Sequence, residues 1–412
     1  MAQFGAGDSP SAAPVRRVFI HAGLPKTGTS YLQSVLWNSK VELLAQDVSM
    51  QPVRRRDHLR VVLKVRNMFK EFDNDWVRAC MERLQRGLEN TTASTVIFSH
   101  ESLAPARPEH ARELVDAFAG FEPHLVLTVR DPAKQIPSAW QQRMQGRETY
   151  TYEEFLDAVF ARTALASDFW WNQDVEDVLA RWSKVIPPEH IHVITCPPSG
   201  AERRLLLSRF CSVVGLDPAT LHDADATSNI SLGQPQAELL RRVNVALGDR
   251  FPDLRSRYWQ LAQVYLAGRI LRPQAGRPAR LPVGRRAEVE ALCEEWIRYI
   301  EERGFDVVGD LDELRPRPDG YETAQVEIGD SELLEVAVRA LADVLENRDG
   351  ELDERNELKD RVKELEDQLR HARSGRGAAR SLARRVIRGR SSSELPVAPA
   401  AETVEGPVRR SL

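Results

Sequence analysis

Four short apolar runs alternate along the chain with longer stretches of helical periodicity, and this alternation constrains the fold more than any other feature. The runs lie at residues 16–21, 94–99, about 124–130 and 190–196. Each has the length of a buried strand, and a helix between successive strands allows those strands to run parallel. We therefore expect an α/β fold with a central parallel sheet and helices on both faces.

Helical periodicity fills most of the sequence between and after these runs. Asp131 and Pro132 are a typical cap and first helical residue, and Pro137 is expected to bend that helix or delay its start. Helices are expected at residues 28–39, about 54–70, 75–88, 108–121, 131–145 and 151–184, and across most of 200–310.

Composition favours a globular protein and argues against some partners. The 412 residues suffice for one large domain or two ordinary ones, and 42% of them are hydrophobic. A formal net charge of -4 is not typical of a nucleic-acid-binding protein, so no nucleic-acid partner is expected. The four cysteines lie far apart without metal-ligand spacing, which favours buried free thiols in a reducing compartment. No leader-like or membrane-spanning apolar run occurs, so we expect a cytoplasmic protein.

The two ends of the chain differ from its middle. Residues 1–15 are rich in Gly, Ser, Ala and Pro and are expected to form a disordered tail. Residues 331–371 carry Leu and Val at 4-3-4 spacing on either side of a turn at Asp349–Gly350, which predicts a helical hairpin or a short coiled coil. Such a segment either packs back on the body or forms a homodimer. Residues 372–412 are Arg-rich and expected to be disordered, either solvated or touching an acidic partner or the inner face of the membrane.

The stretch VFIHAGLPKTGTSYLQ, residues 18–33, joins the first expected strand to a helix through a loop suited to an anion. The first-turn amides of a helix have no intrahelical partners and, with the helix dipole, favour a negative charge. Gly23 and Gly28 allow close approach of a ligand to the backbone, and Lys26 adds a positive charge. The alternative is a tight turn with a solvated lysine. Hydroxyl groups are offered by Thr27, Thr29 and Ser30.

Polar side chains follow three of the expected strands directly. Lys26 follows the first strand, His100 and Glu101 follow the second, and Arg130 follows the third. Ligands of open parallel sheets bind beyond the carboxyl ends of the strands. We therefore expect these four side chains to converge at one edge of the sheet.

The position of the lysine separates this loop from the common nucleotide loop. Lys26 lies two residues before Gly28, whereas GxxxxGK[ST] places lysine directly after the second glycine. PKTGTSYLQ instead resembles the 5′-phosphosulfate loop of sulfotransferases that use 3′-phosphoadenosine 5′-phosphosulfate, and HAGLPKTGTS is most similar to the bacterial members. LVLTVRDPAKQIPSAW resembles the family's 3′-phosphate segment, with Arg130 at the strand end and Ser138 eight residues later. The resemblance covers about residues 16–310, and we expect a domain of residues 16–315.

This resemblance implies a three-layer sandwich like that of P-loop NTPases and a transferase that needs no metal. The donor would be 3′-phosphoadenosine 5′-phosphosulfate, and the acceptor a hydroxyl or amine of a carbohydrate, a lipid or another small molecule. Lys26 would contact the leaving group, while Arg130 and Ser138 would hold the 3′-phosphate. The resemblance assigns the 5′-phosphate to Thr27, Gly28, Thr29 and Ser30.

The base that takes the acceptor proton is either His100 or Glu101, since the family uses a His or a Glu at the end of such a strand. Adjacent residues at a strand end point to opposite sides, so we expect one of the two to face the acceptor and favour Glu101. A structural role is the alternative for each. His21, at the end of the first strand, is interpreted as a structural histidine.

The acceptor pocket and the competing functions are less strongly encoded. DFWWNQD, residues 168–174, groups aromatic and polar side chains that suit either a sugar or phenol or the core, and Gln141 and Gln142 are candidates for the cleft. A P-loop small-molecule kinase would need a different lysine position and a carboxylate for Mg²⁺. A non-catalytic scaffold of the same fold would have no need of Lys26, Arg130 and Ser138.

Overall fold

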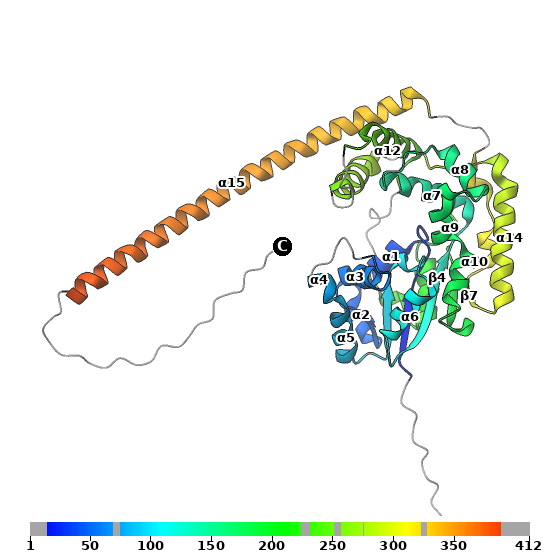
Figure 1. Ribbon diagram of the computed structural model, residues 1–412, viewed down its shortest axis with the longest axis horizontal. Helices are drawn as coiled ribbons and strands as arrows, with labels where there is room; N and C mark the ends of the chain where they lie inside the picture. The colour runs from blue at the N-terminus through cyan, green and yellow to red at the C-terminus, as the bar shows by residue number, and fades with distance from the viewer. Residues whose placement is uncertain are drawn as a thin grey trace, which may run out of the picture. The chain divides into compact units, whose positions relative to one another are not determined.

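The computed structural model describes residues 15–68, 75–223, 231–250, 257–274, 276–322 and 328–388 (Figure 1). It divides into two compact units, Met1–Leu341 and Ala342–Leu412. Residues 1–14 of the tail expected at 1–15, and residues 389–412 of the tail expected at 372–412, lie outside the described residues. Among the helices that the structure describes, none combines the length and hydrophobicity needed to cross a bilayer.

A six-stranded parallel sheet forms the centre of the first unit, with the strand order β2-β3-β1-β4-β5-β7. This confirms the expected α/β fold. The expected strands correspond to four of the six, and the two that the sequence missed, β2 and β7, have three residues each. The strands are β1 (Arg17–His21), β2 (Val48–Met50), β3 (Thr95–Ser99), β4 (Glu122–Val129), β5 (Ile191–Thr195) and β7 (Asp306–Val308). A separate two-stranded sheet pairs β6 (Leu281–Pro282) with β8 (Tyr321–Glu322).

Helices follow most of the strands and cover both faces of the sheet (Figure 1). The stretch expected to be helical at 151–184 contains three separate helices, and 200–310 is mostly helical as expected. The helices of the first unit are α1 (Thr29–Asn38), α2 (Lys40–Ala45), α3 (Arg55–Val65), α4 (Asp75–Arg78), α5 (Cys80–Asn90), α6 (Pro108–Asp116), α7 (Pro132–Gln145), α8 (Tyr152–Phe160), α9 (Ser167–Gln173), α10 (Val175–Trp182), α11 (Leu205–Val214), α12 (Gln234–Leu247), a π-helical segment (Trp259–Leu271) and α14 (Arg286–Arg303).

Alternate residues of the strands enter two hydrophobic cores, one on each face of the sheet. Val18 and Ile20 of β1 lie in the core shared with α3, α5, α6, α10 and α14. Phe19 lies in the opposite core, with α1, α2 and α11. Because both faces are buried, the strands read as continuous apolar runs rather than as alternating patterns. The result is a three-layer arrangement of helices, sheet and helices.

Several local expectations can be compared directly with these elements. Asp131 caps α7, since its carboxylate accepts a hydrogen bond from the Ala133 amide, and the helix continues through Pro137 without a delayed start. The thiols are free and buried, as expected, at Cys80, Cys196, Cys211 and Cys293.

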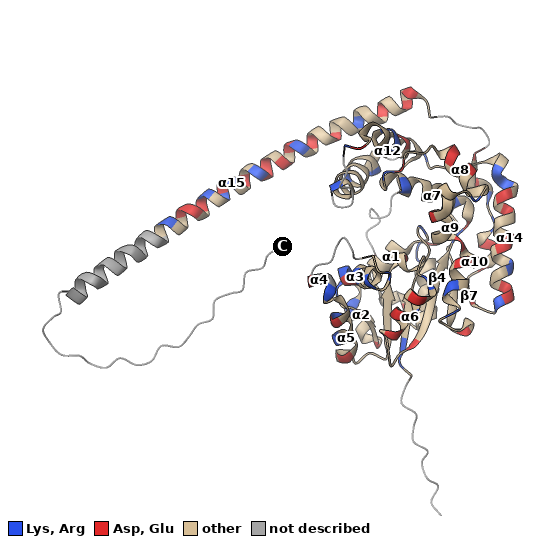
Figure 2. Ribbon diagram, in the orientation of Figure 1, with Lys and Arg blue, Asp and Glu red and all other residues tan. Residues whose placement is uncertain are grey.

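The C-terminal segment forms one long helix where a helical hairpin or short coiled coil followed by a disordered tail was expected. One helix, α15, runs from Asp330 to Arg388 without interruption, so the hairpin turn expected at Asp349–Gly350 is wrong. A single glycine inside a helix costs only about 1 kcal/mol, and the neighbouring Leu, Glu, Arg and Lys residues favour the helix. The helix also includes residues 372–388, which were expected to be disordered. Acidic and basic residues alternate along its described part (Figure 2).

The first turns of α15 pack by a different face from the one that the 4-3-4 spacing indicates. Leu333, Val336 and Ala340 are buried within the first unit. Leu334 and Val338, which belong to the 4-3-4 pattern, are exposed. The expected apolar stripe therefore remains at the surface. The same exposure holds for the remaining members of the pattern, Leu341, Leu345, Leu358, Val362, Leu365 and Leu369.

Candidate active site

The loop between β1 and α1 first continues the sheet and then turns sharply. The amides of Ala22 and Leu24 donate to the carbonyls of Val126 and Thr128, at 3.0 and 3.2 Å, so the chain remains paired with β4 beyond the end of β1. Lys26 then adopts a left-handed backbone conformation, with φ at 72°. A non-glycine residue in this region is strained, and such strain concentrates at functional sites.

Thr27 braces this loop and does not offer its hydroxyl to a ligand. Its side chain is buried, and its Oγ1 donates to the carbonyl of Leu24 at 2.5 Å. The same oxygen lies 2.6 Å from Oγ1 of Thr128, which is also buried. Because the hydroxyl already has two partners within the protein, the expectation that it holds an anion is not supported by this geometry.

A glycine is required at position 23, because the loop packs there so closely against neighbouring side chains that a Cβ would clash. A Cβ at this position would lie 2.1 Å from Thr128 Oγ1, 2.7 Å from Thr29 Cγ2 and 2.8 Å from His21 Nε2. These contacts are too short, and two of the neighbours are stiff β-branched side chains. The glycine therefore allows the loop to lie directly on the strand ends.

We expect Gly23→Ala to lower the free energy of unfolding by about 1–3 kcal/mol, because it overpacks this site. Chemical denaturation measures the change. Gly284→Ala is the matched control, since a Cβ there meets nothing within 4 Å. Equal stability of the two variants would contradict the close packing of the loop.

Helix α1 begins directly after this loop and presents its first-turn amides without a side-chain cap. Gly28 is the N-cap residue, with φ at 85°, and as a glycine it has no side chain that could cap these amides. Thr29 is buried in the first turn and Ser30 is exposed. Unpartnered amides at a helix N-terminus are typical donors to phosphate-like anions.

Three cations surround the same loop. Burial, together with the charges of Arg272 and Arg130, lowers the pKa of Lys26 to about 8. Arg130 Nη1 donates to the Lys26 carbonyl at 3.1 Å. Within the described residues, none of the three side chains forms an ion pair with a carboxylate. Three neighbouring cations without a counter-ion favour an anionic ligand.

Arg272 is a member of this group that the sequence did not indicate. It follows the π-helical segment Trp259–Leu271, far along the chain from the loop. Its Nε is buried and has no hydrogen-bond partner among the described residues. A buried guanidinium nitrogen without a partner is costly, so this group favours a ligand that accepts its hydrogen bond.

The residues expected at the second anion position lie at the end of β4 and on α7. Asp131 is engaged with the Ala133 amide at 2.7 Å, and no pairing with Arg130 occurs among the described contacts. Burial raises the pKa of Asp131 to about 6. Ser138 Oγ donates to the Lys134 carbonyl at 2.9 Å, one turn back on the same helix. Its hydroxyl has to rotate before it can donate to a ligand.

Glu101 is the ionised group next to the loop. It follows β3, the neighbour of β1 in the sheet, and its Oε2 accepts a hydrogen bond of 3.1 Å from Gln33 on α1. Burial alone would raise the pKa of Glu101. The charge of His100 and the hydrogen bonds from the backbone amide of Glu101 and from Gln33 together hold that pKa below its usual value. The carboxylate is therefore charged at neutral pH and available to accept a proton.

His100 is oriented differently. Its Nδ1 accepts a hydrogen bond of 3.1 Å from the Ser102 amide, so Nε2 carries the proton of the neutral ring. Burial lowers the pKa of His100, with Arg66 acting in the same direction and Glu101 opposing. A neutral imidazole in this tautomer donates from Nε2. The arrangement therefore favours Glu101 over His100 as a base.

His21 lies beneath the loop and is neutral. Its Nδ1 is 2.8 Å from Ser99 Oγ, and burial lowers its pKa to about 4 despite the opposing charge of Glu101. Its Nε2 is buried without a partner among the described residues. The structural role expected for His21 thus explains the contact of Nδ1 with Ser99 but leaves Nε2 without a partner among the described residues.

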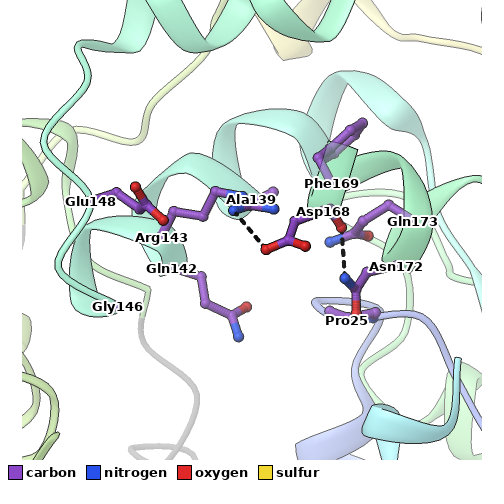
Figure 3. Close-up of a pocket in the computed structure, with 10 residues that line it drawn as sticks. All are labelled: Pro25, Ala139, Gln142, Arg143, Gly146, Glu148, Asp168, Phe169, Asn172 and Gln173. Carbon is purple, nitrogen blue, oxygen red and sulfur yellow. Dashed lines mark hydrogen bonds and ion pairs between the residues drawn. The ribbon is translucent and has the colours of Figure 1, made fainter. Parts of the chain in front are cut away.

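A pocket of about 320 Å³ opens beside Pro25 of the loop (Figure 3). Gln142, one of the two glutamines suggested for the acceptor cleft, lines this pocket, and Arg143 reaches across to Asp168 at 3.7 Å. Gln141 is buried instead and donates to the Leu232 carbonyl at 2.6 Å. The lining combines polar and apolar surface in similar shares and comes mainly from α7 and α9: Pro25, Ala139, Gln142, Arg143, Gly146, Glu148, Asp168, Phe169, Asn172 and Gln173.

The three aromatic residues of α9 differ in their surroundings. Phe169 lines the pocket. Trp170 and Trp171 donate their indole N–H groups to the carbonyls of Val159 and Pro105, at 3.1 and 2.9 Å. Trp170 packs against the core, which was one of the two interpretations of this stretch, whereas Trp171 is 39% exposed.

Comparison with known proteins gives no family for this chain. No known protein family and no curated protein matches it. A sulfotransferase from Alicyclobacillus acidocaldarius is similar at 17% identity and a TM-score of 0.34, over 60% of this chain and 100% of its own. The sulfotransferase domain from the curacin biosynthetic pathway is similar at 16% identity and a TM-score of 0.31, over 62% and 98%. Likeness at these TM-scores carries no argument about function.

Proposed function

We propose that this chain transfers a sulfuryl group from 3′-phosphoadenosine 5′-phosphosulfate to a hydroxyl group of an acceptor. The observation that carries the proposal is the group of three cations, Lys26, Arg130 and Arg272, at the uncapped start of α1. A donor with phosphates at both its 3′ and 5′ positions matches this charge. The ionised Glu101 nearby matches the need for a base.

In this reaction the acceptor oxygen attacks sulfur, and the bond from sulfur to the 5′-phosphate oxygen breaks. Negative charge develops on the leaving phosphate, where preorganised donors are most effective. Lys26 and the amides of residues 28–30 are proposed to meet that charge. Arg130 and Ser138 are proposed to hold the 3′-phosphate, with Arg272 as an additional contact to the nucleotide. These groups supply the positive charge, so the proposal needs no metal ion.

The acceptor hydroxyl must lose its proton during the attack. Glu101 is proposed to accept it, because its carboxylate is charged and is held toward α1 by Gln33. His100 is proposed to donate a hydrogen bond from Nε2. A positioned base of this kind contributes about 10²–10⁴-fold to a rate.

The pocket beside Pro25 is proposed to hold the acceptor. Its amide and charged side chains, including Gln142 and Asn172, suit a molecule with several hydroxyl groups. A carbohydrate or another polar small molecule fits this lining better than a purely apolar one.

Thermal unfolding with adenosine 3′,5′-bisphosphate, ATP or Mg²⁺-ATP separates this proposal from a kinase and from a non-catalytic scaffold. A ligand at 100 times its Kd stabilises the protein by about 2.7 kcal/mol. We expect stabilisation by adenosine 3′,5′-bisphosphate without a metal, and a smaller effect in Arg272→Ala than in the control Arg298→Ala, whose side chain is exposed. Stabilisation by Mg²⁺-ATP alone would support the kinase. If none of the three ligands stabilised the protein, the scaffold would be supported.

The affinity for adenosine 3′,5′-bisphosphate should depend on pH through Lys26. The pKa of this lysine in the free protein is about 8, and bound phosphates favour its charged form. Above about pH 7 the phosphates are fully ionised. We therefore expect a nearly constant affinity between about pH 7 and pH 8 and a fall of up to tenfold per pH unit above it. Titration calorimetry across this range measures the effect, and Lys26→Met should lack it.

Two further expectations remain predictions. A homodimer through residues 331–371 would cover the exposed Leu and Val of α15. Contact of residues 372–412 with an acidic partner or the inner face of the membrane concerns a segment whose side chains the structure does not describe.

A further inference from the structure

A second polar cluster lies at the edge of the sheet opposite the loop. Glu122 and His124 occupy the start of β4, and His192 lies at the start of β5 with His190 directly before that strand. Asp306 begins β7, the neighbour of β5. Because all six strands are parallel, these residues share the amino-terminal edge, whereas the loop and its cations lie at the carboxyl ends.

Four of these side chains form a continuous chain of short contacts. Glu122 Oε1 lies 3.0 Å from His124 Nε2, and His124 Nδ1 lies 3.0 Å from His192 Nε2. His192 Nδ1 lies 2.6 Å from Asp306 Oδ2. Each of these three gaps needs one proton or one cation between its two lone pairs. Two neutral imidazoles bring only two protons, so the chain requires one additional positive charge.

The Asp306 carboxylate determines which of the three contacts lacks a proton. If His192 donates its Nδ1–H to Asp306, its Nε2 accepts the Nδ1–H of His124. The Nε2 lone pair of His124 then faces the Glu122 carboxylate. This is the gap that has to receive the extra cation.

A third ligand is available at that gap. The ring of His190 stacks on the ring of His124, with centroids 4.4 Å apart. One ligand atom each from Glu122, His124 and His190 lies within 4.8 Å of the others. We propose that these three residues bind a divalent transition-metal ion of the zinc class, with a fourth position left for water.

The surroundings of the site agree with a metal centre. The Asp306–His192 pair would orient His124 and increase its basicity, as carboxylate–histidine pairs do behind zinc ligands. His124 is 8% exposed, and Phe19 packs against its ring at 4.9 Å. Arg17 pairs with Glu122, its Nε lying 3.5 Å from Oε1, and its side chain is 53% exposed, so water can solvate its charge when a metal ion binds the carboxylate.

Titration of the full-length, chelator-treated protein with Zn²⁺ tests this site without reference to catalysis. Calorimetry should show one saturable equivalent, and Co²⁺ should give the visible absorption of a low-coordinate site. We expect Glu122→Gln and His190→Gln to weaken Zn²⁺ binding at least tenfold, and Asp306→Asn to weaken it by about 10–100-fold. His222→Ala, at an exposed histidine paired with Glu42, should bind like the wild type.

The conservative variants keep the test independent of folding, and circular dichroism checks each of them. Wild-type protein without a saturable equivalent of Zn²⁺ would show that the extra charge is a proton, and would overturn the proposal. Binding that is the same in Glu122→Gln, His190→Gln and the wild type would overturn it as well. Neither result bears on the nucleotide site at the opposite edge.

Discussion

Replacing Lys26 by methionine is expected to lower the turnover of sulfuryl transfer by about 10²–10³-fold, the usual effect of removing one donor to a developing negative charge. Methionine retains the length of the side chain but not its charge. Turnover is measured as release of adenosine 3′,5′-bisphosphate from the donor in the presence of a metabolite extract. Unfolding experiments establish that the variant is folded.

Lys184→Met is the control for the loss of one positive charge, because Lys184 is exposed and follows α10, away from the loop in sequence. We expect it to have wild-type turnover. If Lys26→Met also retained wild-type turnover, the contact of Lys26 with the leaving group would be refuted. A loss shared equally by both variants would show that net charge, rather than this position, matters.

Replacing Glu101 by glutamine is expected to lower kcat by about 10²–10⁴-fold while donor affinity stays unchanged. The amide preserves the shape of the side chain and its contact with Gln33 but cannot accept the acceptor's proton. The pKa of Glu101 lies below its usual value, so the wild-type rate should show no loss of this base near neutral pH. A pH–rate profile and donor titration measure both quantities.

His100→Ala separates the two candidates for the base. We expect a smaller loss than in Glu101→Gln, because Nδ1 of His100 already accepts the Ser102 amide. The reverse order of the two losses would make His100 the base. Near-normal turnover in both variants would show that neither residue acts as the base.

Much of the architecture follows from the apolar pattern, and the exceptions have physical reasons. The strands with five or more residues are buried on both faces and read as apolar runs, so β1, β3, β4 and β5 were predictable. The two three-residue strands are too short for a pattern. Asp349–Gly350 has the composition of a turn, but the long helical context of α15 outweighs one glycine.

The candidate site was predictable where its residues follow strands directly. Lys26, Glu101 and Arg130 follow β1, β3 and β4, three neighbours in the sheet, so sequence and topology together bring them to one edge. Arg272 carries no such signal, because it comes from a helical segment that reaches the loop through tertiary packing. The engagement of Thr27 with Thr128 was equally invisible, since it joins residues 101 positions apart.

The structure of the protein with bound adenosine 3′,5′-bisphosphate tests the central claim most directly. The account predicts density for the 5′-phosphate against the amides of residues 28–30 and the ammonium group of Lys26. It places the 3′-phosphate within hydrogen-bond distance of Arg130 and Ser138. A nucleotide bound elsewhere, or a loop that stays empty at saturating bisphosphate, would contradict the account.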